Sequence, residues 1–250
     1  MFTPARPHNK TTDIIIERIR TAILEGKLRP GDRLPSEKEL GEKFAVSRQT
    51  MRESLRALEH LGLITLRKGA GGGAFIVEVE REVAVQNLAN YLYFKDLSIT
   101  NLSELRRILE PYAARCAAAQ ISTTDLQRLE TINRETRLGI EQQDSEAVTR
   151  SEIEFHRLIA TQTTNPILIL VLDFVETLLE DFKKILEPDY PFMTAVLLSH
   201  EKIYQAICLG DGETAAAEML DHVIDVEHYL AALQQNKAGK RLWQNCLQAA

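Results

Sequence analysis

Residues 36–61 read SEKELGEKFAVSRQTMRESLRALEHL, and this stretch decides the fold of the N-terminal part of the chain. Ser36 followed by Glu39 is a capping box, in which two side chains bond the free backbone N–H groups at the start of a helix. Ser47 predicts the start of a second helix, after the short connector Ala45-Val46. The apolar face of this second helix comprises Met51, Leu55 and Leu58. Two helices this close together predict a helix-turn-helix.

The flanking segments extend this prediction. Residues 11–25 carry apolar side chains at helical spacing, and Gly26 ends the helix that they predict. On the other side, two short apolar runs at 63–66 and 74–79 predict strands, and the glycine-rich segment 67–73 joins them as a hairpin. Three helices followed by a hairpin describe a winged helix-turn-helix.

From residue 81 onward the chain shows only the periodicity of helices. The segment 83–94 predicts a helix that joins two domains, and the segments after it predict a bundle. We expect its helices to begin at Asn101, to follow Ser122, and to cover 145–161, 165–185, 192–209 and 213–234. The first of them carries its apolar side chains at Leu105, Ile108, Leu109 and Tyr112.

The fold class is therefore mainly α, with an N-terminal winged helix-turn-helix bearing a small β-hairpin wing and a C-terminal all-α bundle of six or seven helices. The expected domain boundaries are 1–80 for the winged helix-turn-helix, with its core at 11–78, then 81–100 for the joining segment, 101–235 for the bundle and 236–250 for a C-terminal tail.

Composition narrows the class of protein. The chain has 250 residues, of which 44% are hydrophobic and 26% charged, as in soluble globular proteins. It has neither an apolar run long enough to cross a bilayer nor the apolar centre of a secretory signal at its start, so we expect no membrane partner and a cytoplasmic location. Cys116, Cys208 and Cys246 form no CxxC pair, which argues against a disulfide framework and a thiolate zinc site. Cys116 and Cys208 are expected to be small core residues.

Charge is distributed unevenly along the chain. Residues 1–80 hold 14 Lys and Arg against 11 Asp and Glu, whereas residues 81–250 hold 16 against 25. A basic N-terminal part on an acidic body permits binding of nucleic acid by the first domain.

The helix predicted to start at Ser47 carries, at its N-terminal end, side chains that can contact DNA bases. Arg48, Arg52 and Arg56 are four residues apart and form a stripe beside the apolar face. Arginine pairs with guanine and glutamine with adenine in the major groove, which gives Arg48, Arg52 and Gln49 candidate roles. Ser47, Thr50 and the Gly69 backbone have the size to contact phosphates, and Lys68 can reach the minor groove or the backbone. A solvated cationic helix face is the alternative, but the capped helix before it and the glycine-rich wing after it favour DNA binding.

The runs Pro30-Gly31-Asp32, Leu34-Pro35-Ser36-Glu37, Val46-Ser47-Arg48 and Arg52-Glu53, together with the glycine-rich wing, closely resemble the GntR family of bacterial regulators. The resemblance covers almost all of residues 11–78 and implies a homodimer that binds an inverted repeat in double-stranded DNA. It places DNA contacts at Lys38, Arg48, Gln49, Thr50, Arg52, Lys68 and Gly69. Lys38 stands where relatives often have arginine, and Gln49 where smaller residues are common, so a consensus operator should not be assumed.

Residues 83–233 resemble the FadR-type ligand-binding domain of that family, the FCD domain, in its seven-helix form. The resemblance rests on short runs: Leu105-Arg106, Leu109-Glu110, Phe155-His156, Asn165-Pro166, His200-Glu201 and the single residue His222. It implies that the bundle binds a small carboxylate-containing metabolite.

Four residues of the bundle have the chemistry of a metal site. Glu152 and His156 are one helical turn apart on the same face, and His200 and His222 are on two other predicted helices, so the four can converge on a divalent cation. Separate core histidines and an ordinary Glu–His pair are the alternative. The resemblance favours the metal, because these positions match the ligands of metal-binding members. The first ligand there is usually aspartate. Nitrogen-rich ligands suit Zn, Ni, Fe or Mn.

Two further residues are candidates for binding the effector. By resemblance, Arg106 corresponds to an arginine that often faces the effector pocket, where its guanidinium would bind a carboxylate at two points. The alternative is a surface pair between Arg106 and Glu110. Asn165 is a second candidate for the pocket, although a role as helix N-cap already accounts for it.

Together these features predict a ligand-responsive transcriptional repressor rather than an enzyme. A metal-dependent hydrolase built on the His and Glu residues is one alternative, but no further nucleophile or acid/base group is apparent beside them. A regulator whose sensor needs no metal is another. A purely architectural DNA-binding protein leaves the second domain without a role.

Overall fold

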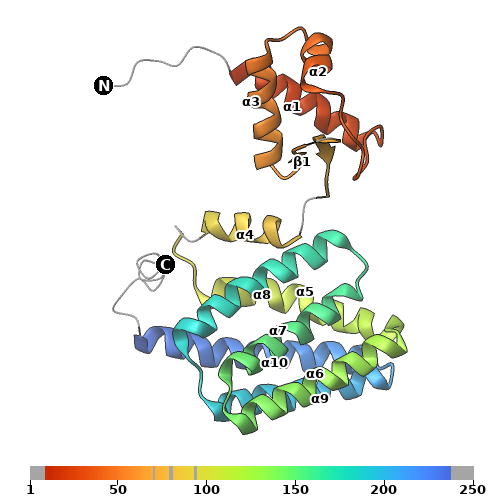
Figure 1. Cartoon of the computed structure of the whole chain (residues 1–250). Coiled ribbons are helices and arrows are strands. Elements are labelled where there is room, and N and C mark those ends of the chain that lie inside the picture. Colours follow the sequence, from red (N-terminus) through yellow and green to blue (C-terminus); the bar gives the residue numbers. More distant parts are fainter. Residues whose placement is uncertain (1–8, 70, 79–80, 93–94, 238–250) are drawn as a thin grey trace. The chain divides into compact units, whose positions relative to one another are not determined.

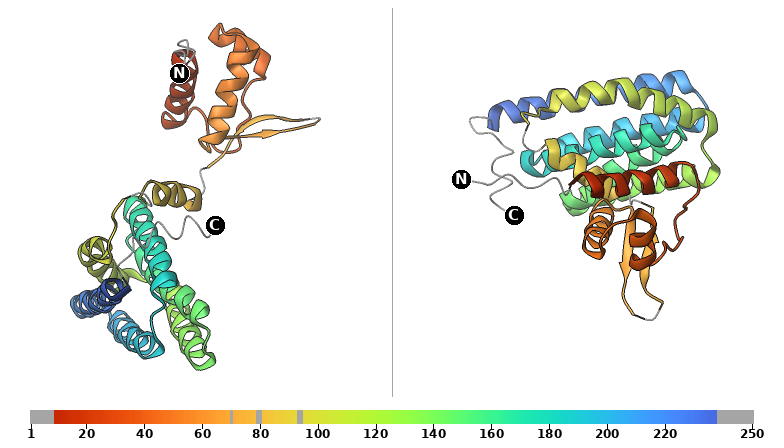
Figure 2. Two further views of the ribbon diagram at one scale, coloured as in Figure 1. Left: turned by 90° about the vertical axis from the view of Figure 1, so that its left-hand side faces the viewer. Right: turned by 90° about the horizontal axis from the view of Figure 1, so that it is seen from above.

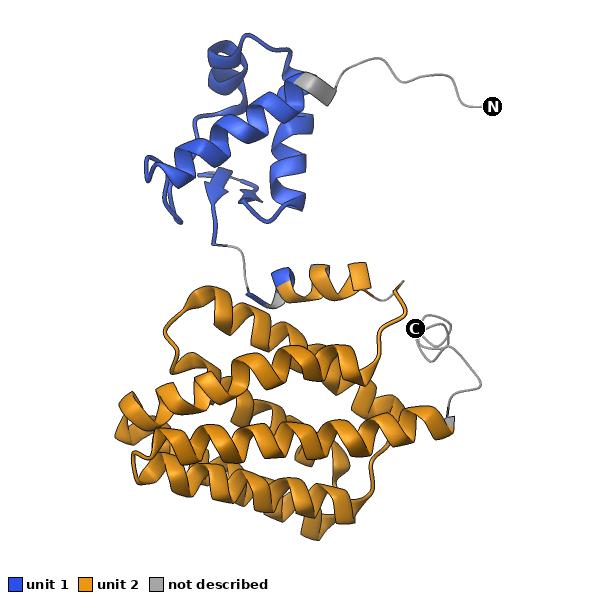
Figure 3. Ribbon diagram, turned by 180° about the vertical axis from the view of Figure 1, so that it is seen from behind, with its two compact units in different colours: residues 1–84 blue, residues 85–250 orange. Residues whose placement is uncertain are grey.

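The computed structural model describes residues 9–69, 71–78, 81–92 and 95–237. The chain divides into an N-terminal unit, residues 1–84, and a C-terminal unit, residues 85–250 (Figure 3). Among the residues that the structure describes, no helix is long and apolar enough to cross a membrane. The expected tail at 236–250, including Cys246, lies outside the described residues except for its first two positions.

The N-terminal unit contains three helices and a two-stranded antiparallel sheet (Figure 1), in the order α1 (Asn9–Leu24), α2 (Glu37–Phe44), α3 (Arg48–His60), β1 (Ile64–Arg67) and β2 (Gly73–Ile76). The capping box at Ser36 and Glu39 forms as predicted, and the Ser47 side chain caps α3 by accepting from the Thr50 N–H at 3.1 Å. The hairpin extends away from the three helices (Figure 2). The winged helix-turn-helix is therefore confirmed.

One feature of this unit was not predicted from the sequence. Residues 31–34, for which the sequence predicted no strand, run beside β2 as a third extended segment. The Leu34 N–H donates to the Ala74 carbonyl at 2.8 Å, and the Ile76 N–H donates to the Asp32 carbonyl at 2.9 Å. Leu34 and Ile76 thereby enter the same apolar core as Met51 and Leu58. The wing is thus anchored to the segment between α1 and α2.

The C-terminal unit is all helical in its described part (Figure 1), as predicted. Its elements are α4 (Arg81–Leu92, which begins before the division between the units), α5 (Ile99–Gln120), α6 (Thr123–Gln142), α7 (Ser145–Thr161), α8 (Pro166–Leu186), α9 (Tyr190–Cys208) and α10 (Gly212–Lys237). Val85 and Ala89 of α4 are buried in the core of this unit, so this part of α4 packs as a seventh helix of the bundle.

Three details of the helices differ from expectation. The helix predicted from Asn101 begins at Ile99, because Ser98 is its N-cap and Asn101 completes the capping box. The apolar residues expected to define its face are largely exposed, at 40% for Leu105, 64% for Ile108 and 49% for Tyr112. Cys208, expected in the core, is exposed at the end of α9, because Ile203 and Ile207 occupy the buried face.

The buried face of α5 is instead partly charged. Leu102 belongs to one apolar cluster and Ala113 to a second, and Arg106 and Glu110 lie between them along the helix. The same order recurs on α9, where His200 follows Val196 of the first cluster and precedes Ile203 of the second. The bundle therefore contains a buried polar layer between two apolar layers.

Candidate functional site

The start of α3 presents its polar side chains to solvent. Arg48, Gln49 and Arg52 are exposed, whereas Met51 and Leu55 are buried in the core of the N-terminal unit. The alternation follows from the helical repeat, which places the apolar residues on one face and the arginines beside it. The structure thus brings Arg48, Gln49 and Arg52 together on one accessible helix end.

Ser47 and Thr50, the two hydroxyl-bearing residues at the start of α3, differ in their exposure to solvent. Ser47 is exposed, but Thr50 is only 8% exposed, and the hydroxyls of the two residues lie 2.9 Å apart. In the structure Thr50 therefore supports the cap, while Ser47 is the more accessible candidate for a phosphate.

The other predicted DNA contacts surround α3. Lys38, at the start of α2, is 71% exposed, and Lys68 and Gly69 are exposed at the turn of the hairpin. Arg52 donates from Nε and Nη2 to the Glu37 carboxylate at 3.3 and 3.2 Å, which ties α3 to the first turn of α2. Since the Arg52 side chain is 62% exposed, this pair can open without a large loss of stability.

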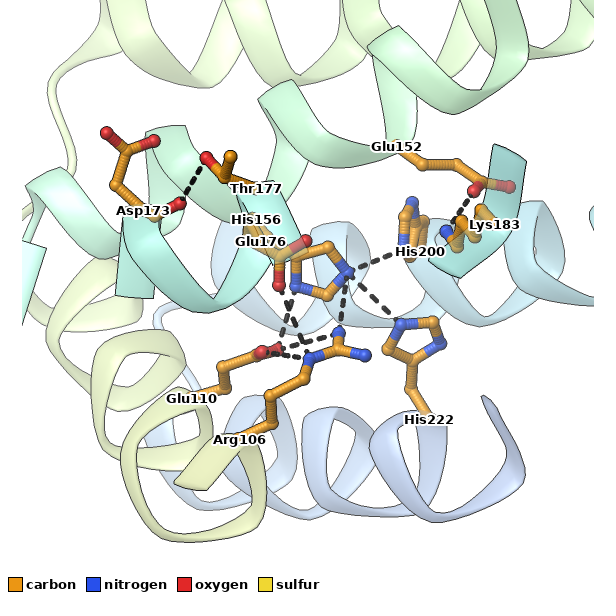
Figure 4. A network of polar contacts seen from close by, with 10 residues as sticks. All are labelled: Arg106, Glu110, Glu152, His156, Asp173, Glu176, Thr177, Lys183, His200 and His222. Atoms are coloured by element: carbon orange, nitrogen blue, oxygen red, sulfur yellow. Dashed lines mark hydrogen bonds and ion pairs between the residues drawn. The ribbon is translucent and has the colours of Figure 1, made fainter. Parts of the chain in front are cut away.

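Three buried histidines from three helices meet in the C-terminal unit (Figure 4). The Nε2 atom of His156 on α7 lies 3.2 Å from Nε2 of His200 on α9 and 3.2 Å from Nε2 of His222 on α10. We call these three residues the histidine cluster. The convergence predicted from the sequence is therefore present for the three imidazoles.

A carboxylate orients the central ring of the cluster. Nδ1 of His156 lies 2.8 Å from Oε2 of Glu110, at ion-pair distance but outside hydrogen-bond geometry, so a proton on Nδ1 would face this carboxylate without a well-aligned bond. In a neutral ring this leaves the Nε2 lone pair directed at the other two histidines. A carboxylate behind a histidine is the usual arrangement that fixes the tautomer of a metal ligand.

Arg106 lies against the same cluster. Its Nη2 is 3.4 Å from Nε2 of His156, and its Nε is 2.5 Å from Glu110 and 3.3 Å from Glu176. The Arg106–Glu110 pair considered from the sequence is thus formed, but it is buried, with side chains 1% and 4% exposed, rather than on the surface. Nη1 of Arg106 is buried without a hydrogen-bond partner among the described residues.

Burial keeps two of the histidines neutral. It lowers the pKa of His200 well below its usual value, and the charge of His156 lowers it further. The pKa of His222 is lowered in the same way by burial and then by His200. A neutral imidazole is the form that binds metal ions.

The two carboxylates near Arg106 respond differently to burial. Burial would raise the pKa of Glu110, but the charges of Arg106 and His156 outweigh it and lower the pKa to about 2. For Glu176 burial prevails over the attraction of Arg106, and its pKa is raised. Glu110 is therefore ionised at neutral pH, and the proton affinity of Glu176 is increased.

Glu152, the fourth predicted ligand, is buried near the cluster but bound by another residue. Its Oε2 lies 2.5 Å from Nζ of Lys183 on α8, and its Oε1 has no hydrogen-bond partner in the described part of the chain (Figure 4). Among the described residues, the groups whose potential ligand atoms lie within 4.8 Å of one another are His156–His200–His222 and Glu110–His156–Glu176. The structure does not bring Glu152 into either group, and its role as a ligand stays a prediction.

The geometry of the histidine cluster fits a metal ion. Nitrogen ligands about 2.0–2.1 Å from a tetrahedral zinc ion are about 3.3 Å from each other, and the two Nε2 separations are 3.2 Å. Nδ1 of His200 is buried without a hydrogen-bond partner among the described residues, so the ring has no other polar contact there that competes with an ion at Nε2. The three histidines could therefore hold a divalent ion.

Asn165 is not brought to this cluster. It is exposed at the start of α8, where its Oδ1 accepts from the Ile167 and Leu168 N–H groups at 3.0 and 3.4 Å. Eleven residues of helix separate it from Glu176, a distance of roughly 16 Å. The cap accounts for Asn165 in the structure.

Sequence reasoning missed Glu176 and Lys183, the two residues that α8 contributes. A signal for them exists in the sequence. Asp173, Glu176 and Lys183 occur at helical spacing among apolar residues of one face of α8, and all three are at least 94% buried. Charged residues on the core face of an apolar helix indicate partners on neighbouring helices.

Two family models match the chain. The model described as bacterial regulatory proteins, gntR family, matches residues 11–74, which cover α1 to the wing. The model described as FCD domain matches residues 101–225, which include all three histidines.

Individual proteins resemble both parts together. The HTH-type transcriptional regulator LutR of Bacillus subtilis is 32% identical over 214 residues, covering 84% of this chain and 96% of the relative. The galactonate operon transcriptional repressor of Escherichia coli is 32% identical over 219 residues, covering 83% and 90%. The solved structure of Streptococcus agalactiae GntR has a TM-score of 0.64 and 25% identity, covering 89% of this chain and 99% of that one.

Proposed function

Since the chain belongs to the gntR family of bacterial regulatory proteins and carries an FCD domain, we propose that it represses transcription until a small organic acid binds its C-terminal unit with the help of a divalent metal ion. The similar proteins are transcriptional regulators and not enzymes, so the metal-dependent hydrolase considered from the sequence is set aside.

The convergence of three imidazoles, with Nε2 of His156 3.2 Å from Nε2 of His200 and 3.2 Å from Nε2 of His222, supports the proposal. His156, His200 and His222 would hold the ion, with Glu110 keeping His156 in the required tautomer. When bound, the ion would supply a Lewis acid with positions left for oxygen ligands. Arg106, with Nη1 unpartnered among the described residues, would bind a carboxylate beside the ion.

The class of effector follows from these groups and from one relative. A divalent ion next to a buried guanidinium favours an anionic ligand, and planar carboxylates match the guanidinium fork. The galactonate operon repressor is named for an operon of a carboxylic acid, which agrees with such a ligand.

DNA binding is assigned to the exposed start of α3. In a homodimer, two copies of this helix would enter successive major grooves at an inverted repeat, with Arg48, Gln49 and Arg52 at base edges. Lys38, Ser47, Lys68 and Gly69 would contact phosphates, and Thr50 would hold the cap. The exposed apolar stripe of α5, formed by Leu105, Ile108 and Tyr112, supports pairing of two chains.

The effector acts by differential affinity. The dimer has a form that binds DNA and a form that does not. The effector needs only a higher affinity for the second form, and a difference of a few kcal/mol between the two affinities shifts the population. Because coupling is reciprocal, operator DNA weakens effector binding by the same factor.

Replacement of His200 by alanine tests the metal part of this proposal. We expect His200→Ala to lose the bound zinc and the response to small acids, while its affinity for DNA selected by the wild-type protein from a random pool stays within about twofold. Metal content and DNA affinity with and without succinate or acetate are the measurements. His228→Ala, at an exposed position of α10, is the matched control. A His200→Ala protein that binds no zinc yet responds as wild type would overturn the role of the metal.

A further inference from the structure

A cavity of about 370 Å³ opens beside the polar layer. It lies among the start of α7, the end of α8 and the start of α9, and its lining includes Arg150, Lys183, Lys184, Tyr190 and Met193. A volume of this size is within the range of small-molecule sites. The cavity is thus large enough to admit a small acid.

Lys183 connects this cavity to the histidine cluster. It lines the cavity, yet its side chain is only 6% exposed, and its ammonium contacts Glu152 at 2.5 Å. Lys183 and Glu152 belong to the same network of polar side chains as the three histidines (Figure 4). The other cations of the lining have partners at the surface, Glu146 for Arg150 and Glu180 for Lys184.

Glu152 contacts Lys183 and lies one helical turn from His156. One of its oxygens contacts Lys183, while the other is buried and has no hydrogen-bond partner among the described residues. Glu152 also precedes His156 by one helical turn, so both side chains project from the same face of α7. A buried oxygen without a partner is costly, and a metal ion at the histidines would offer it one.

We infer that Lys183 competes with the metal ion for Glu152 and, once released, binds a second carboxylate of the effector from the cavity. The inference rests on the proposed function, because it takes the histidine cluster as the metal site. It deepens that function by naming the class of effector, an acid with two carboxylates, one for Arg106 and the ion and one for Lys183.

Charge balance supports a dicarboxylate. The metal-free layer contains the cations Arg106 and Lys183 beside the carboxyl groups of Glu110, Glu152 and Glu176. A divalent ion adds two positive charges where unpaired charge is expensive. A dicarboxylate brings two negative charges and leaves the net charge of the layer as it was. Metal and dicarboxylate therefore bind with positive coupling.

Zinc titration of the full chain tests this inference. We expect Lys183→Met to bind zinc about tenfold more tightly than wild type in buffer without carboxylates, because Glu152 no longer has to be taken from an ammonium. In the wild type, succinate should tighten zinc binding more than acetate does, whereas in Lys183→Met the two acids should have equal effects. Lys202→Met, at a lysine of α9 that is 64% exposed, should behave as wild type.

A second variant covers the case in which Lys183→Met does not fold, since it leaves Glu152 buried without its partner. Glu152→Gln with Lys183→Met removes both charges, and it should bind zinc through the histidines with no advantage of succinate over acetate. An advantage of succinate in either variant, or an unchanged zinc affinity in Lys183→Met, would overturn the inference. Failure of the proposed function looks different: wild type and His200→Ala would then bind zinc equally.

Discussion

The two units of the chain handle charge in opposite ways. In the N-terminal unit the cations assigned to DNA are exposed, at 71% for Lys38 and 62% for Arg52. In the C-terminal unit the cations assigned to the effector are buried, at 1% for Arg106 and 6% for Lys183, and each contacts a carboxylate. One unit presents charge to a partner outside the chain, and the other balances charge within it.

This difference determines what a substitution does in each unit. An exposed arginine adds little to folding, so its removal is felt mainly when DNA is bound. A buried arginine belongs to a network in which each charge stabilises the others, and its loss leaves a carboxylate unpaired at a cost of about 3–5 kcal/mol. Binding and stability are therefore separable in the N-terminal unit and coupled in the C-terminal unit.

The largest effect is expected from Arg48→Ala combined with Arg52→Ala. Each arginine paired with a base contributes about 1–3 kcal/mol, so the double variant should lose at least about 30-fold in affinity for the selected DNA. Its free energy of unfolding should change by about 1 kcal/mol or less, because the ion pair that it loses among the described residues, Arg52–Glu37, is partly exposed to solvent. DNA titration at fixed salt and urea denaturation measure the two quantities.

Removal of two other cations from the same unit provides the control. Arg20 and Lys27 are 47% and 70% exposed, and neither is on α3. Arg20→Ala with Lys27→Ala removes the same charge and should weaken DNA binding only slightly. If both double variants bind the selected DNA equally well, α3 does not read the bases.

The sequence was sufficient for the local features of both units. Ser36, Ser47, Ser122 and Asn165 were predicted as helix caps, and each accepts a backbone N–H in the structure. A cap is decided by residues three positions apart, so a single sequence contains the information. The same reasoning predicted that α5 starts at Asn101, whereas its N-cap in the structure is Ser98. Ser98 and Asn101 form one capping box, and the sequence pattern did not show which of the two is the N-cap.

The contacts between helices were less accessible to prediction. His156, His200 and His222 were brought together by resemblance, and their spacing alone left separate core histidines open. The pairing of Glu152 with Lys183 joins α7 to α8 across 31 residues and has no local signature. The periodicity of apolar residues also could not show that α5 buries Arg106 and exposes Ile108. Arg106 is buried because carboxylates and an imidazole, some of them on neighbouring helices, surround its guanidinium.

The second prediction concerns acid stability without metal. His200 and His222 have lowered pKa values in the folded protein, so below a pH of about 6.5 the unfolded chain takes up protons that the folded chain does not. Each histidine should then reduce the free energy of unfolding of the C-terminal unit by about 1.4 kcal/mol per pH unit. Glu176, whose pKa is raised, changes the free energy of unfolding with pH in the opposite direction. It is one group against two histidines, so the effect of the histidines is the larger.

Denaturation in the presence of a chelator, followed by hydrogen exchange of peptides from each unit, measures this effect between pH 7.5 and 5.5. Glu110, with a pKa of about 2, stays ionised in this window, and its contribution is lost only as the pH falls from about 4.5 towards 2. The N-terminal unit should change less, because its described histidine, His60, is exposed. A C-terminal unit whose stability is independent of pH in this range would mean that the histidines are not buried as neutral rings.

The smallest expected effect comes from two serines that cap helices in the same way, one in each unit. Ser47 caps α3 and Ser122 caps α6, and each side chain accepts a backbone N–H at 3.1 Å. Alanine at either position should reduce the free energy of unfolding by about 1 kcal/mol. Aspartate restores a cap, so Ser47→Asp and Ser122→Asp should both recover stability. Only Ser47→Asp should weaken DNA binding, because its carboxylate would face phosphate beside Arg48, and equal DNA affinity for the two aspartate variants would remove Ser47 from the DNA-binding surface.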